Sequence, residues 1–303
     1  MRIRHRVIQS FTLAEVLIAT AILSLLVLLL TSLVSGVHRA WVSGEQQVSE
    51  FQDGRAILEL ISRELSQATI SPNLQFVENP SLPSAVNQRA NSDSIFWQGP
   101  ATSTNSGNLA EIGYYLTEDP TNAGGAVYQL KRFFVPPSDT ANYKIFTSPN
   151  QPTDIGAPWV TSFASNTLST VVSNGVLAFW IRCYDRNDDL IPWYFSNGGV
   201  TPLKFNSTAP FQGAIPGQSL SFKYTNRSTT ARANLLPAAV ELTVITLDPQ
   251  TFKRNPKIPA QVPQSAPDDL AATTASFNKQ LISNNIKNAH MFTTRVNLVN
   301  CGQ

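Results

Sequence analysis

An uninterrupted apolar run near the N-terminus constrains this chain more than any other feature. Residues 16–34 read VLIATAILSLLVLLLTSLV, and their only polar side chains are hydroxyls. As a helix that rises 1.5 Å per residue, the run is about 28 Å long, enough to cross the hydrocarbon core of a bilayer. Arg2, Arg4 and Arg6 precede the run, and excess positive charge favours the cytoplasmic side. We therefore predict a single-pass membrane protein with its N-terminus inside and everything after His38 outside.

Two simpler interpretations of the apolar run are a cleaved secretory signal and a plain signal anchor. A secretory signal has a shorter apolar stretch and ends in a small-residue cleavage site, and no good site of this kind follows residue 34. In a signal anchor, Glu15 would be a charge at the membrane edge, favoured by the positive end of the helix dipole. Neither interpretation explains why the helical pattern continues.

The sequence after the apolar run has the pattern of an amphipathic helix. Apolar residues recur at spacings of three, four and seven from Trp41 to Leu65, with charged and amide side chains between them. We predict one helix from about Thr12 to Ala68, about 85 Å long. Pro72 follows soon after its end.

The rest of the chain has the pattern of an antiparallel sheet, because short strand-like runs alternate with loops rich in Pro, Asn, Ser and Gly. Apolar residues alternate with polar ones around Tyr114, Leu242 and Val296. Further strands are predicted over 94–98, 126–134, 176–184, 191–195 and 219–224. The predicted fold class is α+β, with the long N-terminal helix packed against an antiparallel β-sheet head, because one sheet face should cover the apolar stripe of the helix.

The predicted organisation has four parts and several long loops. The parts are a basic leader over 1–10, a transmembrane helix over 11–37, its amphipathic continuation over 38–70 and a β-rich head over 71–303. The loops fall at about 78–92, 135–158, 197–217 and 255–267. Loops of this length often carry binding function, and otherwise decorate the surface. The last is the most proline-rich, so we predict a linker there, followed by a short helix from Asp268.

The segment Ser10-Phe11-Thr12-Leu13-Ala14-Glu15-Val16-Leu17-Ile18-Ala19, after a short basic leader, resembles the cleavage and methylation segment of type IV pilins and type II secretion pseudopilins. The resemblance implies that a prepilin peptidase cuts between Ser10 and Phe11 and methylates the new amine of Phe11. Ser10 stands where the family usually has Gly. A charge among lipid tails costs about 2.5 to 3.5 kcal/mol on insertion scales, so Glu15 needs a partner. The resemblance implies that this partner is the Phe11 ammonium of a neighbouring subunit; the alternative is the amine of its own chain.

Several short segments of the head carry a second resemblance. The segments RAILELISRELSQA, IGYYL, GVLAF and LPAAVEL occur in the order seen in the minor pseudopilin J family, and residues 66–72 followed by SIFWQGP resemble the family called Verru_Chthon cassette protein C. The resemblance implies a non-enzymatic minor pilin or pseudopilin in a filament or tip complex of a type IV pilus-like or type II secretion-like system. Implied partners are other pilin-like or pseudopilin subunits, the prepilin peptidase, an inner-membrane assembly platform and membrane lipid, and no cofactor is implied.

This resemblance also implies a location, and it leaves two other classes of function open. The protein would lie in the inner, cytoplasmic membrane with its head in the periplasm or outside, and then in the assembled filament. One alternative is a membrane-anchored ligand-binding module that does not polymerise. The other is an anchored enzyme, which would have to act without the usual histidine chemistry.

Charge and histidine content argue against nucleic-acid binding and enzymatic function. Without the first ten residues, the chain has 19 basic and 20 acidic residues. A protein that binds nucleic acid through phosphates needs a basic surface instead. His290 is the only histidine of the predicted head, and no HExxH, GxSxG, P-loop or GxGxxG pattern appears in its required context. We predict that the protein is not an enzyme and does not bind nucleic acid.

One acidic loop and two cysteines are the remaining candidate sites. Asp185, Asn187 and Asp189 have the spacing that begins a calcium loop, and Asp188 adds a carboxylate. Leu190 and Ser196 stand where an EF-hand needs Gly and Glu, so a hairpin turn is the favoured interpretation and calcium binding the weaker one.

Cys183 and Cys301 are the only cysteines. An outward-facing compartment permits a disulfide between them, which would contribute about 4 to 5 kcal/mol by the chain-entropy argument. The alternative is a free buried Cys183 that continues the apolar face of Leu177, Phe179 and Ile181.

Overall fold

The computed structural model describes fewer residues than the chain contains. These are residues 12–69, 76–79, 82, 86–100, 107–119, 127–143, 168–184, 188, 205–206, 237–247, 258–259, 261–263, 270–286 and 289–299. The fold class is α+β, as the sequence predicts: one long N-terminal helix precedes a head with two antiparallel sheets. The chain divides into two compact units, Met1–Ser49 and Glu50–Gln303.

The long helix α1 spans Leu13–Leu65, 53 residues, or about 80 Å. The predicted helix is confirmed, although it ends three residues earlier than expected. Ser66 and Gln67 form a turn, and the backbone N–H of Thr69 then donates to the carbonyl of Gln98. The helix therefore ends because the chain passes into a sheet hydrogen bond, before Pro72 is reached.

The first sheet has six strands in the order β5-β4-β3-β2-β1-β7, and every neighbouring pair is antiparallel. The strands are β1 (Val77–Glu78), β2 (Ser94–Pro100), β3 (Leu109–Asp119), β4 (Val127–Val135), β5 (Ser169–Asn174) and β7 (Phe205–Asn206). Gly113 lies opposite Phe96 in the β2–β3 pair, and a Cβ atom at Gly113 would come within 2.1 Å of the Phe96 ring. Gly113 thus lets the Phe96 ring lie across the neighbouring strand.

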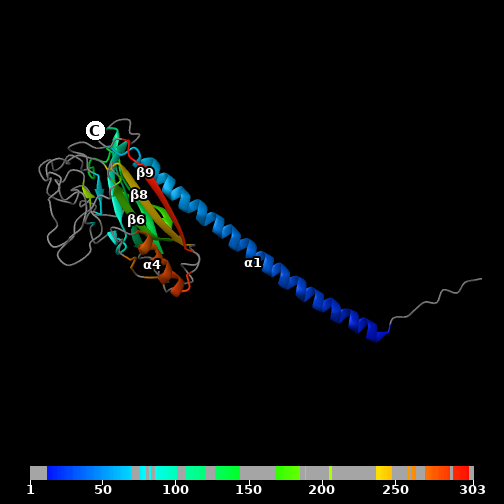
Figure 1. The fold of residues 1–303 in the computed structure, drawn as a ribbon. Coiled ribbons are helices and arrows are strands. Elements are labelled where there is room, and N and C mark those ends of the chain that lie inside the picture. Colours follow the sequence, from blue (N-terminus) through cyan, green and yellow to red (C-terminus); the bar gives the residue numbers. More distant parts are fainter. Residues whose placement is uncertain are drawn as a thin grey trace, which may run out of the picture. The chain divides into compact units, whose positions relative to one another are not determined.

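The second sheet has three strands in the order β6-β8-β9, also antiparallel. These are β6 (Val176–Tyr184), β8 (Ala239–Leu247) and β9 (Ala289–Asn297), which lie side by side in Figure 1. Helix α4 (Leu270–Ser283) packs against this sheet, where Phe277 meets Trp180 edge to face at 6.0 Å between ring centroids. The helix expected from Asp268 is confirmed.

Both sheets contribute to one large hydrophobic core, together with the last turns of α1. Ile57, Leu58, Ile61 and Leu65 of α1 are buried in it. The expectation that a single sheet face covers the helix is therefore incomplete, because strands of both sheets belong to the same cluster. A smaller cluster contains Val86, which precedes β2, and four residues of the six-stranded sheet: Phe96, Tyr115, Phe133 and Val135.

Most strand predictions are confirmed, and the main errors concern short strands. Strands β2, β3, β4, β6, β8 and β9 match predicted runs. The sequence does not predict β5, and the two-residue strands β1 and β7 fall in predicted loops. The strands expected over 191–195 and 219–224 lie outside the described residues.

The proline-rich segment before α4 is attached to the head where the structure describes it. The Arg89 guanidinium donates to the carbonyl of Pro259 at 2.7 Å, and the Asn91 side chain donates to the carbonyl of Val262 at 2.9 Å. Val262 is itself buried in the large core. The interpretation of 255–267 as a linker is therefore wrong for these residues, because an apolar side chain and two carbonyl acceptors fix them.

Candidate functional site

Glu15 and Thr12 form a capping box at the N-terminal end of α1. The Glu15 Oε2 atom accepts hydrogen bonds from the Thr12 backbone N–H at 2.8 Å and the Thr12 hydroxyl at 3.0 Å, and the Glu15 N–H donates to that hydroxyl oxygen at 3.4 Å. In such a box the side chains satisfy backbone groups that have no partner within the helix. Within the described part of the chain, Glu15 Oε1 accepts no hydrogen bond and stays available to a cation.

The helix after Glu15 presents apolar side chains to its surroundings on every side. From Leu13 to Val37, each large apolar residue is at least half exposed. The helix is long and apolar enough to cross a membrane, and none of its most apolar 18-residue window is buried.

Three hydroxyls in this stretch are bonded within the helix. Thr20, Ser24 and Thr31 each donate to a carbonyl one turn back, at 2.7 to 2.9 Å. They therefore need no water, which is the condition that a bilayer interior imposes.

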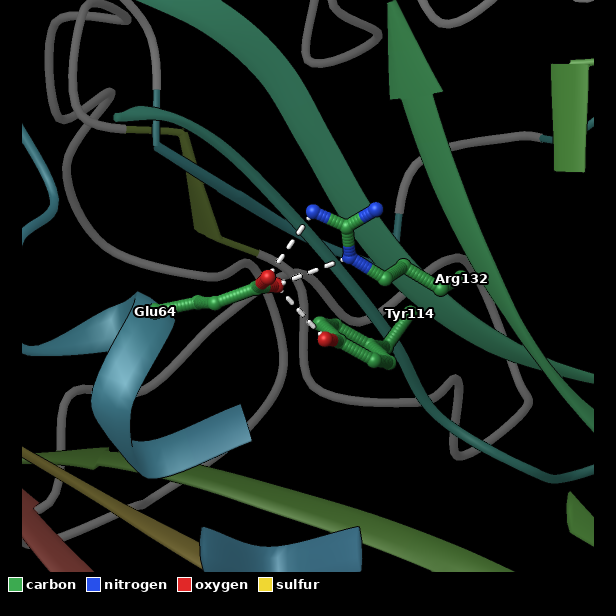
Figure 2. Close-up of polar contacts among 3 residues, drawn as sticks. All are labelled: Glu64, Tyr114 and Arg132. Carbon is green, nitrogen blue, oxygen red and sulfur yellow. Dashed lines mark hydrogen bonds and ion pairs between the residues drawn. The ribbon is translucent and has the colours of Figure 1, made fainter. Parts of the chain in front are cut away.

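The C-terminal end of α1 is fixed to the six-stranded sheet by the charged side chains drawn in Figure 2. Glu64 Oε2 accepts from the Tyr114 hydroxyl at 2.6 Å and from Arg132 Nε at 3.0 Å, and Arg132 Nη2 donates to Glu64 Oε1 at 2.8 Å. Burial and the hydrogen bond to this carboxylate raise the pKa of Tyr114. Burial lowers the pKa of Arg132, but its contacts with Glu64 outweigh that effect and raise it. The arrangement is a structural anchor, since both oxygens of the Glu64 carboxylate accept hydrogen bonds from side chains of the sheet.

A second contact joins α1 to β9 within the head. A Cβ atom at Gly54 would come within 2.3 Å of the Phe292 ring, so the missing side chain makes room for that ring. One turn earlier, the ring of Phe51 lies 4.8 Å from His290 and 5.5 Å from Phe292, between centroids. His290 Nε2 lies 3.3 Å from Glu50 Oε2. The only histidine of the predicted head therefore contacts the helix.

The other sequence-predicted site residues are only partly described. Ser10 and Phe11 lie outside the described residues, as do Asp185, Asn187 and Asp189. Asp188 is described, and its carboxylate is paired with Arg295. In the part of the chain that the structure describes, no group of three or more His, Cys, Asp or Glu side chains could hold a metal ion.

The two cysteines are also described unequally. Cys183 is buried, with 1% of its surface exposed, and forms no disulfide with a described residue. Its surroundings raise its pKa, through burial first and then through the charge of Glu78. Cys301 lies outside the described residues, so its pairing stays a prediction.

Comparison of the chain with protein-family models, with curated proteins and with solved structures finds no match. The functional assignment therefore rests on the residues of this chain and on their geometry.

Sequence reasoning missed several residues that the structure brings into use. Thr12 could have been found, because Thr12-x-x-Glu15 is the sequence pattern of a capping box. Glu64 could not, since its partners Tyr114 and Arg132 are 50 and 68 residues away. A single charged residue in an amphipathic helix gives no sign of such distant partners.

Proposed function

We propose that this protein is a minor pilin or pseudopilin, a non-enzymatic subunit of a type IV pilus-like or type II secretion-like filament or tip complex. One observation carries the proposal. The N-terminal part of α1 is apolar and exposed on all sides, and a carboxylate stands at its entrance. A surface of this kind is stable only in lipid or against other apolar helices.

The geometry of Glu15 supports an assembly role. Its Oε2 atom is held by Thr12, while Oε1 accepts no hydrogen bond within the described part of the chain. An ammonium group of an adjacent subunit, such as a processed Phe11 terminus, can therefore bind Oε1 without displacing the cap. In the low dielectric of a helix bundle, such a pair fixes the axial stagger between neighbouring helices.

Under this proposal the protein is stored in the cytoplasmic membrane and later moved into the filament. The N-terminal part of α1 serves as membrane anchor first and as filament core afterwards. The partners are other pilin-like subunits, a prepilin peptidase, an inner-membrane assembly platform and lipid. The head faces the periplasm or the outside, because Arg2, Arg4 and Arg6 keep the N-terminus in the cytoplasm.

Mass spectrometry of the N-terminus, on protein purified from its native host, tests the processing step. A chain that begins at a methylated Phe11 supports the proposal. A chain that retains Met1 and carries an unmodified Phe11 contradicts it, and favours an anchored module that does not polymerise.

The Glu15→Ala variant tests the assembly step. We expect it to insert and to be processed but to fail to co-purify with other pilin-like subunits, because the carboxylate for the neighbouring amine is missing. Glu45→Ala is the matched control, since Glu45 is an exposed carboxylate on the same helix beyond the apolar run. Normal co-assembly of Glu15→Ala would overturn the assembly role of Glu15.

A further inference from the structure

The two sheets of the head meet at a seam that is built from buried polar groups. Strand β6 pairs with β8 on one side. On its other side, Asp93 takes the place of a neighbouring strand: the Asp93 N–H donates to the Phe179 carbonyl at 2.8 Å, and Asp93 Oδ2 accepts from the Ile181 N–H at 2.8 Å. Asp93 is 1% exposed. One buried carboxylate therefore joins the start of β2 to the edge of β6.

The second oxygen of Asp93 is also occupied. Asp93 Oδ1 accepts from the Asn79 side-chain amide at 2.8 Å. Asn79 is held in turn by Ser94, whose N–H donates to the Asn79 side-chain oxygen at 2.7 Å and whose carbonyl accepts from the Asn79 N–H at 2.8 Å. Both Asp93 oxygens thus face N–H donors, which lower the pKa of Asp93, but burial outweighs them and raises it to about 7.

Glu78 lies in the same seam, but its carboxylate has different surroundings from that of Asp93. It has no exposed surface, and neither of its carboxylate oxygens accepts from an N–H or O–H group of the described residues; the donor beside it is the Cys183 thiol. The strands that flank β1 place Ile95 and Phe205 opposite Glu78, so neither contributes an ionisable group there.

The titratable groups that act on Glu78 are Asp93 and, from β6, Arg182 and Cys183. Burial, and then the charge of Asp93, raise the pKa of Glu78 well above its usual value, against weaker opposing effects of Cys183 and Arg182. The same burial raises the pKa of Cys183, so the thiol adds no charge near neutral pH.

The charges of these four groups balance only with an added proton. Arg182 supplies one positive charge, while Glu78 and Asp93 would supply two negative ones. An unpaired buried charge is costly, and a buried carboxyl group avoids that cost by binding a proton. Asp93 accepts two N–H groups, whereas no N–H group of the described residues reaches the Glu78 carboxylate, so Glu78 holds the proton more strongly.

We propose that the head folds with one proton held on Glu78, and that loss of this proton as the pH rises loosens the attachment of Asp93 to the edge of β6. An ionised Glu78 would place a second negative charge beside Asp93 in a dry seam. The seam would thus make the stability of the head sensitive to the pH of the compartment that the head faces.

The sign of the effect follows from proton linkage. A glutamate in the unfolded chain has a pKa of about 4.3, and in the folded head the pKa of Glu78 is raised. Between these two values the folded state holds the extra proton. Stability is therefore greatest at acidic pH and falls as the pH rises, by about tenfold in the folding equilibrium constant per pH unit for one proton.

Denaturant titration of the full chain in detergent micelles at pH 5, 6 and 7 tests the proposal. Near-ultraviolet circular dichroism follows the head, because Trp97 and Trp180 are fully buried in it. We expect the folding equilibrium constant to fall at least tenfold per pH unit, because the proton on Glu78 contributes about tenfold and Asp93, with a pKa of about 7, adds to it. The Glu78→Gln variant should fall less steeply, since an amide of the same shape exchanges no proton and only Asp93 then responds.

Glu59→Gln is the matched control and should keep the wild-type dependence, since Glu59 is an exposed carboxylate of the same unit. A wild-type head whose stability does not fall over this pH range overturns the proposal. So does a Glu78→Gln head that falls with pH as steeply as the wild type.

Hydrogen exchange on the wild-type full chain gives a second test that does not depend on a variant folding. The protection of a β6 peptide that contains Ile181 is compared with that of a β3 peptide that contains Tyr114, at pH 5 and pH 8. We expect β6 to lose protection relative to β3 at the higher pH. An unchanged ratio between the two peptides overturns the loosening of the seam.

Discussion

The two ends of α1 place similar apolar side chains in opposite environments. In the N-terminal part, Leu13 is 82% exposed and Leu26 is 51% exposed, whereas Ile61 and Leu65 near the C-terminal end are fully buried. Both parts belong to one continuous helix. The difference teaches that apolar side chains alone do not determine where a helix is buried, because the head provides a core for the second part only.

The exposed part is too large to be an ordinary protein surface. Monomeric soluble proteins rarely expose continuous apolar patches beyond a few hundred Å², whereas here large apolar residues recur from Leu13 to Val37 and nearly all are more than half exposed. At about 25 cal/mol per Å², covering such a surface is strongly favourable. The proposed function supplies that cover, as lipid before assembly and as other helices afterwards.

The largest expected effect on the stability of the head is that of a leucine-to-alanine substitution near the C-terminal end of α1, compared with the same substitution in its N-terminal part. Leu65→Ala should lower the free energy of unfolding of the head by about 2 to 5 kcal/mol, because it removes a fully buried side chain and leaves a cavity. Leu26→Ala should leave that free energy within about 0.5 kcal/mol of wild type. Denaturant titration of the full chain in micelles measures both.

The pair of variants separates two explanations of the burial difference. If Leu26→Ala destabilised the head as strongly as Leu65→Ala, the N-terminal part of the helix would be contributing to the folding of the head. The claim that only the C-terminal part of α1 stabilises the head would then be wrong.

A smaller effect is expected from Glu64→Gln, which removes the charge that fixes the C-terminal end of α1. We expect a loss of about 1.5 to 3 kcal/mol, because Arg132 and Tyr114 both donate to this partly buried carboxylate. The same denaturant titration measures the loss. Glu59→Gln, on the same helix but exposed, should change stability by less than about 0.5 kcal/mol. Equal effects of the two variants would show that the anchor is not specific.

The sequence predicts the parts of the molecule that depend on local pattern. Residues 16–34 could be identified as a membrane-spanning candidate because the signal is their composition, and strands such as β6 and β8 because their apolar residues are continuous or alternate. The strand β5 is short and has no buried residue, so no periodicity marks it. The strands β1 and β7 have two residues each, too few for any pattern.

The polar contacts within the head could not be predicted, because each depends on residues far apart in the chain. Asp93 meets Ile181 across 88 positions, and Arg89 meets Pro259 across 170. Asp and Arg in a loop-like stretch are more often solvated, so the sequence favours the wrong environment for both. Only the tertiary fold reveals that these charges are buried.

The smallest expected effect concerns the N-terminal end of α1, which must be stabilised by its own residues. After the C-terminal end, the Thr69 N–H donates to the carbonyl of Gln98 in β2. The N-terminal end has the capping box of Thr12 and Glu15. Thr12→Ala removes the hydroxyl from that box and should destabilise the first turn by about 0.5 to 2 kcal/mol. Hydrogen exchange of the first-turn amides, in the full chain in micelles, measures this loss as faster exchange.

Two control variants test whether the effect is specific to the Thr12 hydroxyl. Thr12→Ser keeps a hydroxyl at the cap and should exchange as the wild type does. Thr31→Ala removes a hydroxyl that bonds only to the Val27 carbonyl within the helix, so the first turn should not respond. If Thr12→Ala leaves first-turn exchange unchanged, the Thr12 hydroxyl does not hold the N-terminal end of α1. The Glu15 carboxylate, whose Oε2 also accepts from the backbone N–H of residue 12, would then be the group that holds the first turn.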